Sequence, residues 1–289
     1  MPETVKDPVM SAAQFDKLRK IVYERSGIHF SDAKKYVLES RLSRRLVELE
    51  IDDYDHYVEL LTMGPFRDDE FQEMFNKITI NETSFFRNEP QLEVFEKQAL
   101  AKLIEARAST KRLRIWSAAC SSGEEPFTLA MMVHRTLGIR LADWRVEILG
   151  TDISEKALEV AAEGKYNDYA IRSTPPTILH RYFRKEGTTF TIDATIKSMV
   201  VFDVLNLKDR LAAKRHGRWD VIFCRNVMIY FDEAMKEQVV NTFGEQLADD
   251  GHLFIGHSET LRGLKTPFEQ VNVPQGFCYQ KSKPATKAA

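Results

Sequence analysis

The sequence predicts an α/β protein in which a mainly parallel sheet follows a small all-α N-terminal domain. Apolar residues recur at helical spacing through roughly the first 80 residues, where no strand pattern appears. From residue 112 onward, short apolar runs alternate with helical segments, which is typical of parallel strands joined by helices. The length of 289 residues fits two domains of about 150 residues each.

Bulk composition excludes several classes of protein. Hydrophobic residues make up 43% of the chain, and the net charge of -2 lacks the basic excess typical of nucleic-acid binding. Three cysteines without CxxC spacing predict a reducing compartment, with no disulfide and no metal site. No apolar run approaches the ~18 residues that a membrane span needs. We therefore expect a cytoplasmic protein that neither binds nucleic acid nor inserts into a membrane.

The N-terminal domain is expected to cover residues 1–80. Ser11 and Gln14 form a capping-box pattern that begins a helix, and Gly27 marks its end. Three further amphipathic helices follow. The apolar positions expected to face the core are Phe15, Leu18, Ile21, Val22, Val37, Leu38, Leu42, Leu46, Tyr57, Val58, Leu60, Leu61, Phe71, Met74, Phe75 and Ile78.

A linker and a connecting helix are expected over residues 81–111, and the sheet domain over 112–283. The predicted strands lie at 115–117, 146–150, 199–202, 221–224 and 252–256, with helices at 91–108, 124–137, 154–163, 206–213 and 232–247 and a terminal hairpin at 268–273 and 277–280. Residues 164–197 interrupt the alternation and predict a small antiparallel insertion. The leader at 1–10 is expected to fray, and the tail at 284–289 to be disordered.

The most informative stretch is RIWSAACSSGEEPFT at 114–128. It is a strand, a loop of small residues and a helix start, the arrangement that holds nucleotide-like ligands in open α/β sheets. Glu124 and Glu125 suit the positive end of the helix dipole but would repel a phosphate. The ligand is therefore expected to be a nucleoside with a cationic end.

An acidic residue, Asp152, follows the second predicted strand in ILGTDIS. At this position a carboxylate can accept both hydrogen bonds of a ribose diol, or it can cap the helix that begins near Ser154. The loop after the first strand lacks GxGxxG, which disfavours a dinucleotide. S-adenosylmethionine is the commonest remaining nucleoside ligand of such sheets.

Two later strand ends also carry candidates. Asn206 and Leu207 follow the third strand, where they could flank an adenine ring, although Asn206 could instead cap the next helix. Arg225 and Asn226 follow the fourth strand and indicate a site at its carboxyl edge. Cys224 is expected to be a core residue, and position alone leaves Tyr230 either in the core or at a reacting centre.

Five sequence words together resemble the CheR family, the chemotaxis receptor methyltransferases that methylate glutamates. They are NETSFFR at 81–87, WSAACSSGEEP at 116–126, TDIS at 151–154, FCRNVMIYF at 223–231 and GHSE at 256–259. The resemblance runs in order from about residue 12 to residue 280. It implies a Rossmann-like class I methyltransferase sheet, with S-adenosylmethionine as cofactor and S-adenosylhomocysteine as product.

The resemblance also implies roles at the methionine and ribose ends of the cofactor. Positions matching Asn81, Thr83 and Arg87 reach over the cofactor from the segment between the domains. The position matching Glu125 binds the methionine amino group, and that matching Asp152 binds the ribose. An ammonium partner accounts for Glu125, while Glu124 is assigned to the helix start.

The remaining implied positions follow the third and fourth strands. Those matching Asn206 and Leu207 border the adenine, and those matching Arg225 and Asn226 lie along the cofactor. Tyr230 matches a tyrosine near the transferable methyl group. All of these residue types are present, which favours an active enzyme.

The implied reaction makes a methyl ester of a glutamate side chain. Because that carboxyl has a pKa near 4.3, it is already ionised at neutral pH and needs no general base. The enzyme must align it at roughly 3–3.5 Å from the methyl group, so Arg87 and Tyr230 are expected to be catalytic by positioning. His257 is either a polar site residue or a structural residue that closes the fifth strand.

The implied partner is the cytoplasmic domain of methyl-accepting chemotaxis receptors. The basic face of the second helix is either a solvated surface or a docking site for acidic receptor helices; it comprises Lys34, Lys35, Arg41, Arg44 and Arg45. In some family members the inserted subdomain binds a receptor C-terminal pentapeptide through a longer loop. The short turn here, with Gly187 as its glycine, predicts an enzyme that does not depend on that tether. The enzyme is also expected to be a monomer.

Two alternatives stay open. One is a methyltransferase acting on another substrate class, such as RNA or a small molecule. The other is a non-catalytic module that senses S-adenosylmethionine.

Overall fold

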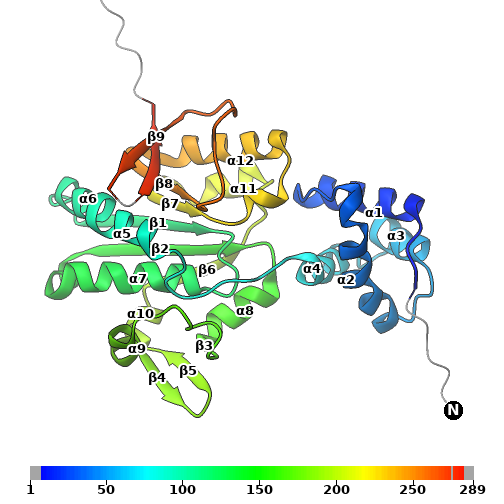
Figure 1. The fold of residues 1–289 in the computed structure, drawn as a ribbon, viewed down its shortest axis with the longest axis horizontal. Helices are drawn as coiled ribbons and strands as arrows, with labels where there is room; N and C mark the ends of the chain where they lie inside the picture. The colour runs from blue at the N-terminus through cyan, green and yellow to red at the C-terminus, as the bar shows by residue number, and fades with distance from the viewer. Residues whose placement is uncertain (1–7, 275, 283–289) are drawn as a thin grey trace, which may run out of the picture.

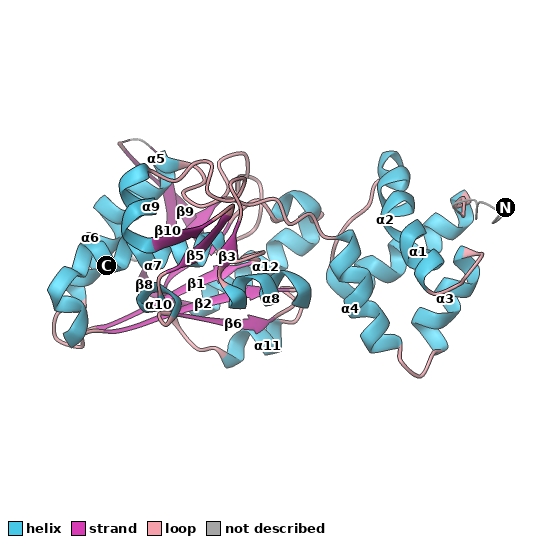
Figure 2. Ribbon diagram, turned by 90° about the horizontal axis from the view of Figure 1, so that it is seen from below, coloured by secondary structure: helices cyan, strands magenta, loops and turns pink. Residues whose placement is uncertain are grey.

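The computed structural model describes residues 8–274 and 276–282. Figures 1 and 2 show a helical part at one end and a sheet-containing part at the other, joined by an extended segment between α4 and α5. Residues 81–87 of that segment, here called the strap, have no helix or strand. The predicted tail at 284–289 and most of the predicted leader lie outside the described residues.

Four α-helices form the N-terminal part: α1 (Ala12–Ser26), α2 (Lys35–Glu48), α3 (Tyr54–Met63) and α4 (Arg67–Ile78). Both ends of α1 are as predicted, with a capping box at Ser11 and the left-handed Gly27 (φ 76°) after it. The four helices share one hydrophobic core. Met10 is buried, and its N–H donates a hydrogen bond to the Glu39 carboxylate. The prediction that the leader frays is therefore wrong at this residue.

The second part contains a seven-stranded sheet in the order β6-β2-β1-β7-β8-β10-β9. The strands are β1 (Arg112–Ala118), β2 (Arg145–Asp152), β6 (Val200–Val204), β7 (Trp219–Cys224), β8 (Leu247–Ile255), β9 (Phe268–Val273) and β10 (Gly276–Lys281). The first five are mutually parallel, and β10 pairs antiparallel with both β8 and β9. The predicted mainly parallel α/β sheet with a terminal hairpin is confirmed.

Alternate residues of each central strand enter different cores. In β7, Val221 and Phe223 pack on the face covered by α5 (Glu89–Val94), α6 (Ala101–Ala106) and α7 (Glu124–Leu137). A π-helical turn, Phe95–Leu100, joins α5 to α6. Ile222 and Cys224 face α12 (Glu233–Gln246) and α11 (Arg210–Arg215) on the other side. Cys224 is therefore a core residue, as expected.

Helix α8 (Glu155–Glu163) and α12 occupy their predicted ranges within a residue, but α11 starts four positions late. Asn206 does not cap it. Its Oδ1 accepts from the Lys208 N–H in a local turn, and Asp209 caps the helix instead.

The predicted insertion is a separate three-stranded antiparallel sheet in the order β3-β5-β4. Its strands are β3 (Lys165–Tyr166), β4 (Phe183–Glu186) and β5 (Thr189–Ile192), accompanied by α9 (Pro176–Tyr182) and α10 (Ala194–Lys197). Phe190 and Ile192 of β5 join the core beside α7, so the insertion packs on the main sheet domain.

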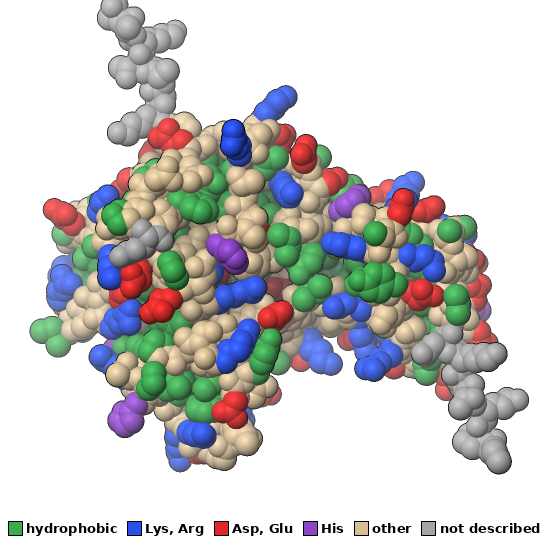
Figure 3. All heavy atoms as spheres, viewed as in Figure 1, with side chains coloured by type: hydrophobic (Ala, Val, Ile, Leu, Met, Phe, Trp, Pro, Cys, Tyr) green, Lys and Arg blue, Asp and Glu red, His purple; other side chains and the backbone are tan. Residues whose placement is uncertain are grey.

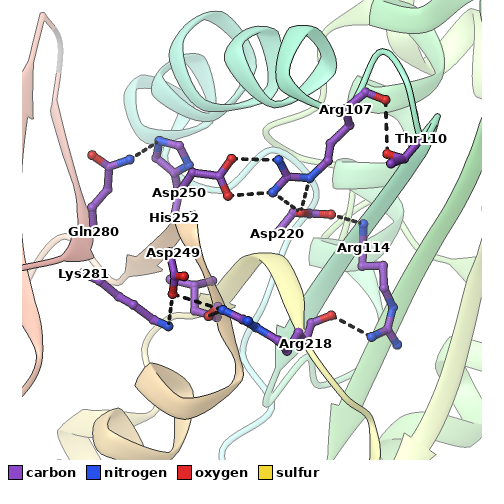
Figure 4. Close-up of polar contacts among 11 residues, drawn as sticks. Arg107, Thr110, Arg114, Arg218, Asp220, Asp249, Asp250, His252, Gln280 and Lys281 are labelled. Carbon is purple, nitrogen blue, oxygen red and sulfur yellow. Dashed lines mark hydrogen bonds and ion pairs between the residues drawn. The ribbon is translucent and has the colours of Figure 1, made fainter. Parts of the chain in front are cut away.

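The amino ends of β1 and β7 are closed by a charge network (Figure 4). Arg107 donates to Asp220 (2.9 Å) and, through two nitrogens, to Asp250 (2.7 and 2.6 Å). Asp220 also accepts from the Arg114 N–H, and Arg114 binds Glu147 through a bidentate pair. The cavity of about 330 Å³ at this edge is thus lined by arginines already matched with carboxylates.

Candidate active site

A cavity of about 360 Å³ lies at the carboxyl ends of the parallel strands, where the strap and the helical part meet the sheet. Every predicted cofactor-binding or catalytic residue lines this cavity: Asn81, Thr83, Arg87, Glu125, Asp152, Asn206, Leu207, Arg225, Asn226 and Tyr230. Because these residues come from the strap and four strand ends, only the folded chain brings them together.

The loop after β1 has an unusual backbone. Ala119 (φ 58°) and Ser121 (φ 52°) are left-handed although neither is glycine, and both line the cavity. Gly123 (φ 90°) follows, and a Cβ there would lie 2.8 Å from the Ala161 Cβ. Such conformations persist where the surroundings impose them, often at ligand sites. The small residues predicted in this loop are thus needed because the backbone follows a left-handed, closely packed path.

Glu125, at the start of α7, forms the charged centre of the cavity. Its Oε1 accepts from the Ser117 hydroxyl (2.7 Å), and its Oε2 pairs with Arg225 Nη1 (3.2 Å). Burial raises the pKa of the Glu125 carboxyl, a trend that Arg225 opposes. Burial likewise lowers the pKa of Arg225.

Arg225 also connects the fourth strand end to the strap. Its Nη2 donates to the Arg87 carbonyl (2.7 Å), while its buried Nε has no hydrogen-bond partner among the described residues. Arg87 in turn donates to the Glu82 carbonyl (2.8 Å). One carboxylate and two guanidinium groups therefore share this end of the cavity.

Asp152 is buried at the end of β2. Its Oδ2 accepts from the Ser121 N–H (2.8 Å) and its Oδ1 from the Ser154 N–H (2.9 Å). Burial raises the pKa of this carboxyl. The cap of α8 is Ser154, whose hydroxyl accepts from Ala157, so the alternative that Asp152 caps that helix is wrong. A carboxylate has about four acceptor sites, so Asp152 retains capacity for a further donor.

Tyr230 and Asn226 complete the wall after β7. Tyr230 is half-buried, its hydroxyl has no hydrogen bond to the described residues, and burial raises the pKa of its phenol. Asn226 is left-handed (φ 60°), and its N–H is held by Glu259 (3.0 Å). Glu259 also accepts from the Gly256 N–H (2.6 Å), whereas His257 is exposed and does not line the cavity. The structural role at the end of the fifth parallel strand, one of the two roles considered for His257, therefore belongs to Glu259.

The helical part contributes a wall that the sequence did not predict. Ile28, His29, Lys34 and Tyr36 line the cavity from this side. Ile28 forms a β-bridge with Phe231. The sequence carried one usable signal, a glycine followed by Ile-His-Phe outside any helical pattern.

Hydrogen bonds fix this wall against the strand ends. The His29 N–H donates to the Tyr230 carbonyl (2.8 Å), and Asn206 Nδ2 donates to the Arg25 carbonyl (2.6 Å). Lys208 Nζ donates to the carbonyls of Tyr23 and Glu24 (both 2.7 Å) at the end of α1.

Comparison with known proteins agrees with this geometry. Residues 81–277 match the family model described as the SAM-binding domain of CheR methyltransferase, and residues 13–79 match its all-alpha domain. The chain belongs to the CheR methyltransferase family. Its curated relatives include the chemotaxis protein methyltransferase of Borreliella burgdorferi, 38% identical over 87% of this chain and 89% of the relative. That of Escherichia coli is 36% identical, covering 90% and 88% of the two chains.

The CheR domain match makes S-adenosylmethionine the cofactor, and the cavity fits its methionine end. An amino acid carries one ammonium and one carboxylate. Glu125 complements the first, and the unpartnered Arg225 Nε with Arg87 complements the second. The implied class I methyltransferase fold with an all-α N-terminal domain is likewise confirmed.

Two absences complete the description. No helix among the described residues is long and apolar enough to cross a membrane. Within the same residues, no group of three or more His, Cys, Asp or Glu side chains is arranged to hold a metal ion.

Proposed function

We propose that this CheR-family protein transfers a methyl group from S-adenosylmethionine to glutamate side chains in the cytoplasmic domain of chemoreceptors. The curated relatives carry the name chemotaxis protein methyltransferase. The observation that carries the proposal is that the Glu125–Arg225 pair, Arg87 and Tyr230 line the same cavity.

The proposed cofactor contacts follow the order of the strand ends. Glu125 binds the methionine ammonium, Arg87 and Arg225 lie near its carboxylate, and Asp152 accepts from the ribose hydroxyls. Support for the Asp152 role comes from its burial and from its free lone pairs.

The remaining contacts concern the adenine and the edges of the cofactor. Asn206 and Leu207 border the adenine, Asn226 lies along the cofactor, and Asn81 with Thr83 covers it from the strap. The position of all five side chains on the cavity wall supports these assignments.

When bound, S-adenosylmethionine supplies an activated methyl group bonded to a positively charged sulfur. The substrate carboxylate, with an ordinary pKa near 4.3, is already ionised. Arg87 orients it by charge, and the Tyr230 phenol donates a hydrogen bond to it. A tyrosine of ordinary pKa, about 10, is already protonated at neutral pH, and burial raises the pKa of Tyr230 further. Positioning of this kind requires no general base.

The basic face of α2 supplies fewer docking cations than the sequence indicated. Arg45 pairs with the buried Glu70 (2.6 Å), and Arg41 donates to the carbonyls of Lys77 and Thr79 at the end of α4. Those two arginines stabilise the helical part. We propose that the exposed Arg44 of α2, together with Lys34 in the turn just before α2, contacts acidic receptor helices.

The insertion supports a tether-independent enzyme. Strands β4 and β5 are joined by only Gly187 and Thr188, with Gly187 in the left-handed region (φ 59°). This tight hairpin lacks the longer loop expected of a pentapeptide-binding member. We further propose a cytoplasmic monomer in which residues 1–80 dock the receptor, 81–111 connect, and 112–283 hold the cofactor.

The proposal is tested with S-adenosylmethionine labelled in its methyl group and membranes that contain the organism's receptors. We expect protein-bound label that alkali releases as methanol, with or without the receptor C-terminal segment. Label that resists alkali, or that requires added RNA, would contradict carboxylate methylation.

Tyr230→Phe separates an enzyme from a sensor. Loss of one hydrogen bond to a charged carboxylate costs about 1.5–3 kcal/mol, so kcat should fall roughly 10- to 100-fold. The dissociation constant for S-adenosylhomocysteine, measured by calorimetry, should stay within about twofold of wild type. A wild-type protein that binds the cofactor and transfers nothing would favour the sensing module.

A further inference from the structure

The strap is irregular backbone, yet it carries three of the proposed cofactor contacts. On the cavity side it is hydrogen-bonded to the loop after β1, to the end of β7 and to helix α7. Ser121 donates to the Asn81 carbonyl (3.3 Å), and Arg225 donates to the Arg87 carbonyl (2.7 Å). The Phe86 N–H donates to the Thr128 hydroxyl (3.2 Å), so these bonds hold both ends of the strap and Phe86.

The inserted subdomain holds the middle of the strap from the other side. The Phe85 N–H donates to the Ala170 carbonyl (2.9 Å). The Phe85 ring is fully buried and makes edge-to-face contacts with the rings of Tyr166 and Phe183, at centroid-to-centroid distances of 4.7 and 5.0 Å. Phe85 therefore anchors the strap to the insertion through both backbone and side chain.

A second set of contacts lies closer to the cavity and involves charge. The Tyr169 hydroxyl donates to Glu82 Oε1 (3.1 Å), and Arg172 Nη2 lies 3.5 Å from the same oxygen. The Arg172 guanidinium stacks over the Tyr169 ring at 3.8 Å. The two insertion residues thus brace each other against Glu82.

Arg172 also reaches the strap backbone. Its Nη1 donates to the Thr83 carbonyl (3.4 Å) and to the Tyr169 carbonyl (2.6 Å). The Glu82 carbonyl in turn accepts from Arg87. The chain of contacts therefore runs from Arg172 through Glu82 to the guanidinium at the proposed reacting centre.

We propose that Arg172, braced by Tyr169, is a positioning residue that holds the strap in its cofactor-binding conformation. This inference rests on the proposed function, because it concerns the affinity of the same site. It makes the inserted subdomain a determinant of cofactor binding, in addition to any role in receptor contact.

The expected effect is on affinity. If the strap adopts the binding conformation for only a fraction of the time, the apparent dissociation constant rises by the inverse of that fraction. Saturating cofactor restores the conformation, so kcat should change little. Because Arg172 and Glu82 are partly exposed (33% and 58% of their side chains), the change should be moderate, about 3- to 10-fold.

The test compares Arg172→Ala with Arg184→Ala as a matched control. Arg184 lies on β4 of the same insertion, is 82% exposed, and pairs only locally with Glu186 among the described residues. Arg172→Ala should raise both the dissociation constant of S-adenosylhomocysteine and the KM for S-adenosylmethionine by the same 3- to 10-fold factor. Arg184→Ala should match wild type, and Arg172→Lys should recover part of the affinity.

A double-mutant cycle guards against a folding artefact. Glu82 is exposed, so Glu82→Gln should leave the fold intact. Because Glu82 and Arg172 contact each other, the effects of Glu82→Gln and Arg172→Ala on the free energy of cofactor binding should be clearly less than additive. Unchanged affinity in Arg172→Ala, or a fall in kcat at unchanged affinity, would overturn the positioning role. Wild-type protein that does not bind S-adenosylhomocysteine would instead overturn the proposed function itself.

Discussion

Glu124 and Glu125 are adjacent in the chain, yet only Glu125 lines the cavity. Glu124 is buried on the other side of the helix start, where its Oε2 accepts from the Ser122 hydroxyl (2.8 Å). Tyr166 donates to the Ser122 carbonyl (2.7 Å) and closes that side. One helical residue step thus separates a ligand-facing carboxylate from a structural one.

Exchanging each glutamate for its amide tests this division. Glu125→Gln removes the charge that faces the cofactor ammonium, worth about 1.5–3 kcal/mol, so the dissociation constant of S-adenosylmethionine should rise roughly 10- to 100-fold. Glu124→Gln is the matched control and should change binding less than about twofold. Equal losses in calorimetric titrations of the two variants would contradict the assignment.

At the scale of the element, the start of α7 is sensitive to pH. Burial raises the pKa of Glu124 from 4.5 to about 7. Between pH 4.5 and pH 7, the Glu124 carboxyl binds its proton more tightly in the folded protein than in the unfolded chain. The contribution of Glu124 to stability is therefore complete below pH 4.5 and is lost as the pH rises through 7.

Glu124→Gln should escape this loss. The free energy of unfolding of the variant, relative to wild type, should increase by roughly 2.5 kcal/mol between pH 5 and pH 8. Urea unfolding of both proteins at the two pH values gives this difference directly. A difference that stays constant with pH would show that Glu124 titrates at its ordinary pKa.

The elements also show what local sequence can and cannot predict. Strand ends are marked by an apolar run that stops at a polar residue, which is why Asp152 and Arg225 could be placed at one edge from the sequence. The docking of Ile28 onto Phe231 depends on a backbone bridge between distant segments, and no local pattern encodes it. The sequence predicts a linker where the strap lies, but the contacts of Arg172 with the strap join distant segments and are visible only in the fold.

At the scale of the molecule, the helical part and the sheet share one wall. A Cβ at Gly27 (φ 76°) would lie 2.6 Å from the Met235 Sδ of α12, so the end of α1 fits closely against the sheet domain. Asn76 of α4 makes a second contact, where it accepts from the Ser154 hydroxyl (2.8 Å) at the start of α8.

Figure 3 shows Lys and Arg side chains interspersed with Asp and Glu over both parts of the visible face.

Lys208→Ala should loosen this joint. The lysine donates to two carbonyls at the negative end of α1, and hydrogen bonds to a charged group contribute about 1.5–3 kcal/mol. Amide exchange at His29, which bonds the Tyr230 carbonyl, should accelerate by about tenfold or more. Lys214→Ala is the control, since Lys214 pairs with Glu245 (2.6 Å) away from the joint. Equal exchange in both variants would argue against Lys208 as a tie.

The bridge between Ile28 and Phe231 has a consequence for how the protein can be divided or recombined. Because residues of the helical part line the cavity, removal of residues 1–80 would open one side of the cavity to water. A chimera with another member's helical part would inherit foreign side chains in that lining. The two parts are therefore expected to change together in evolution, as halves of one catalytic enclosure.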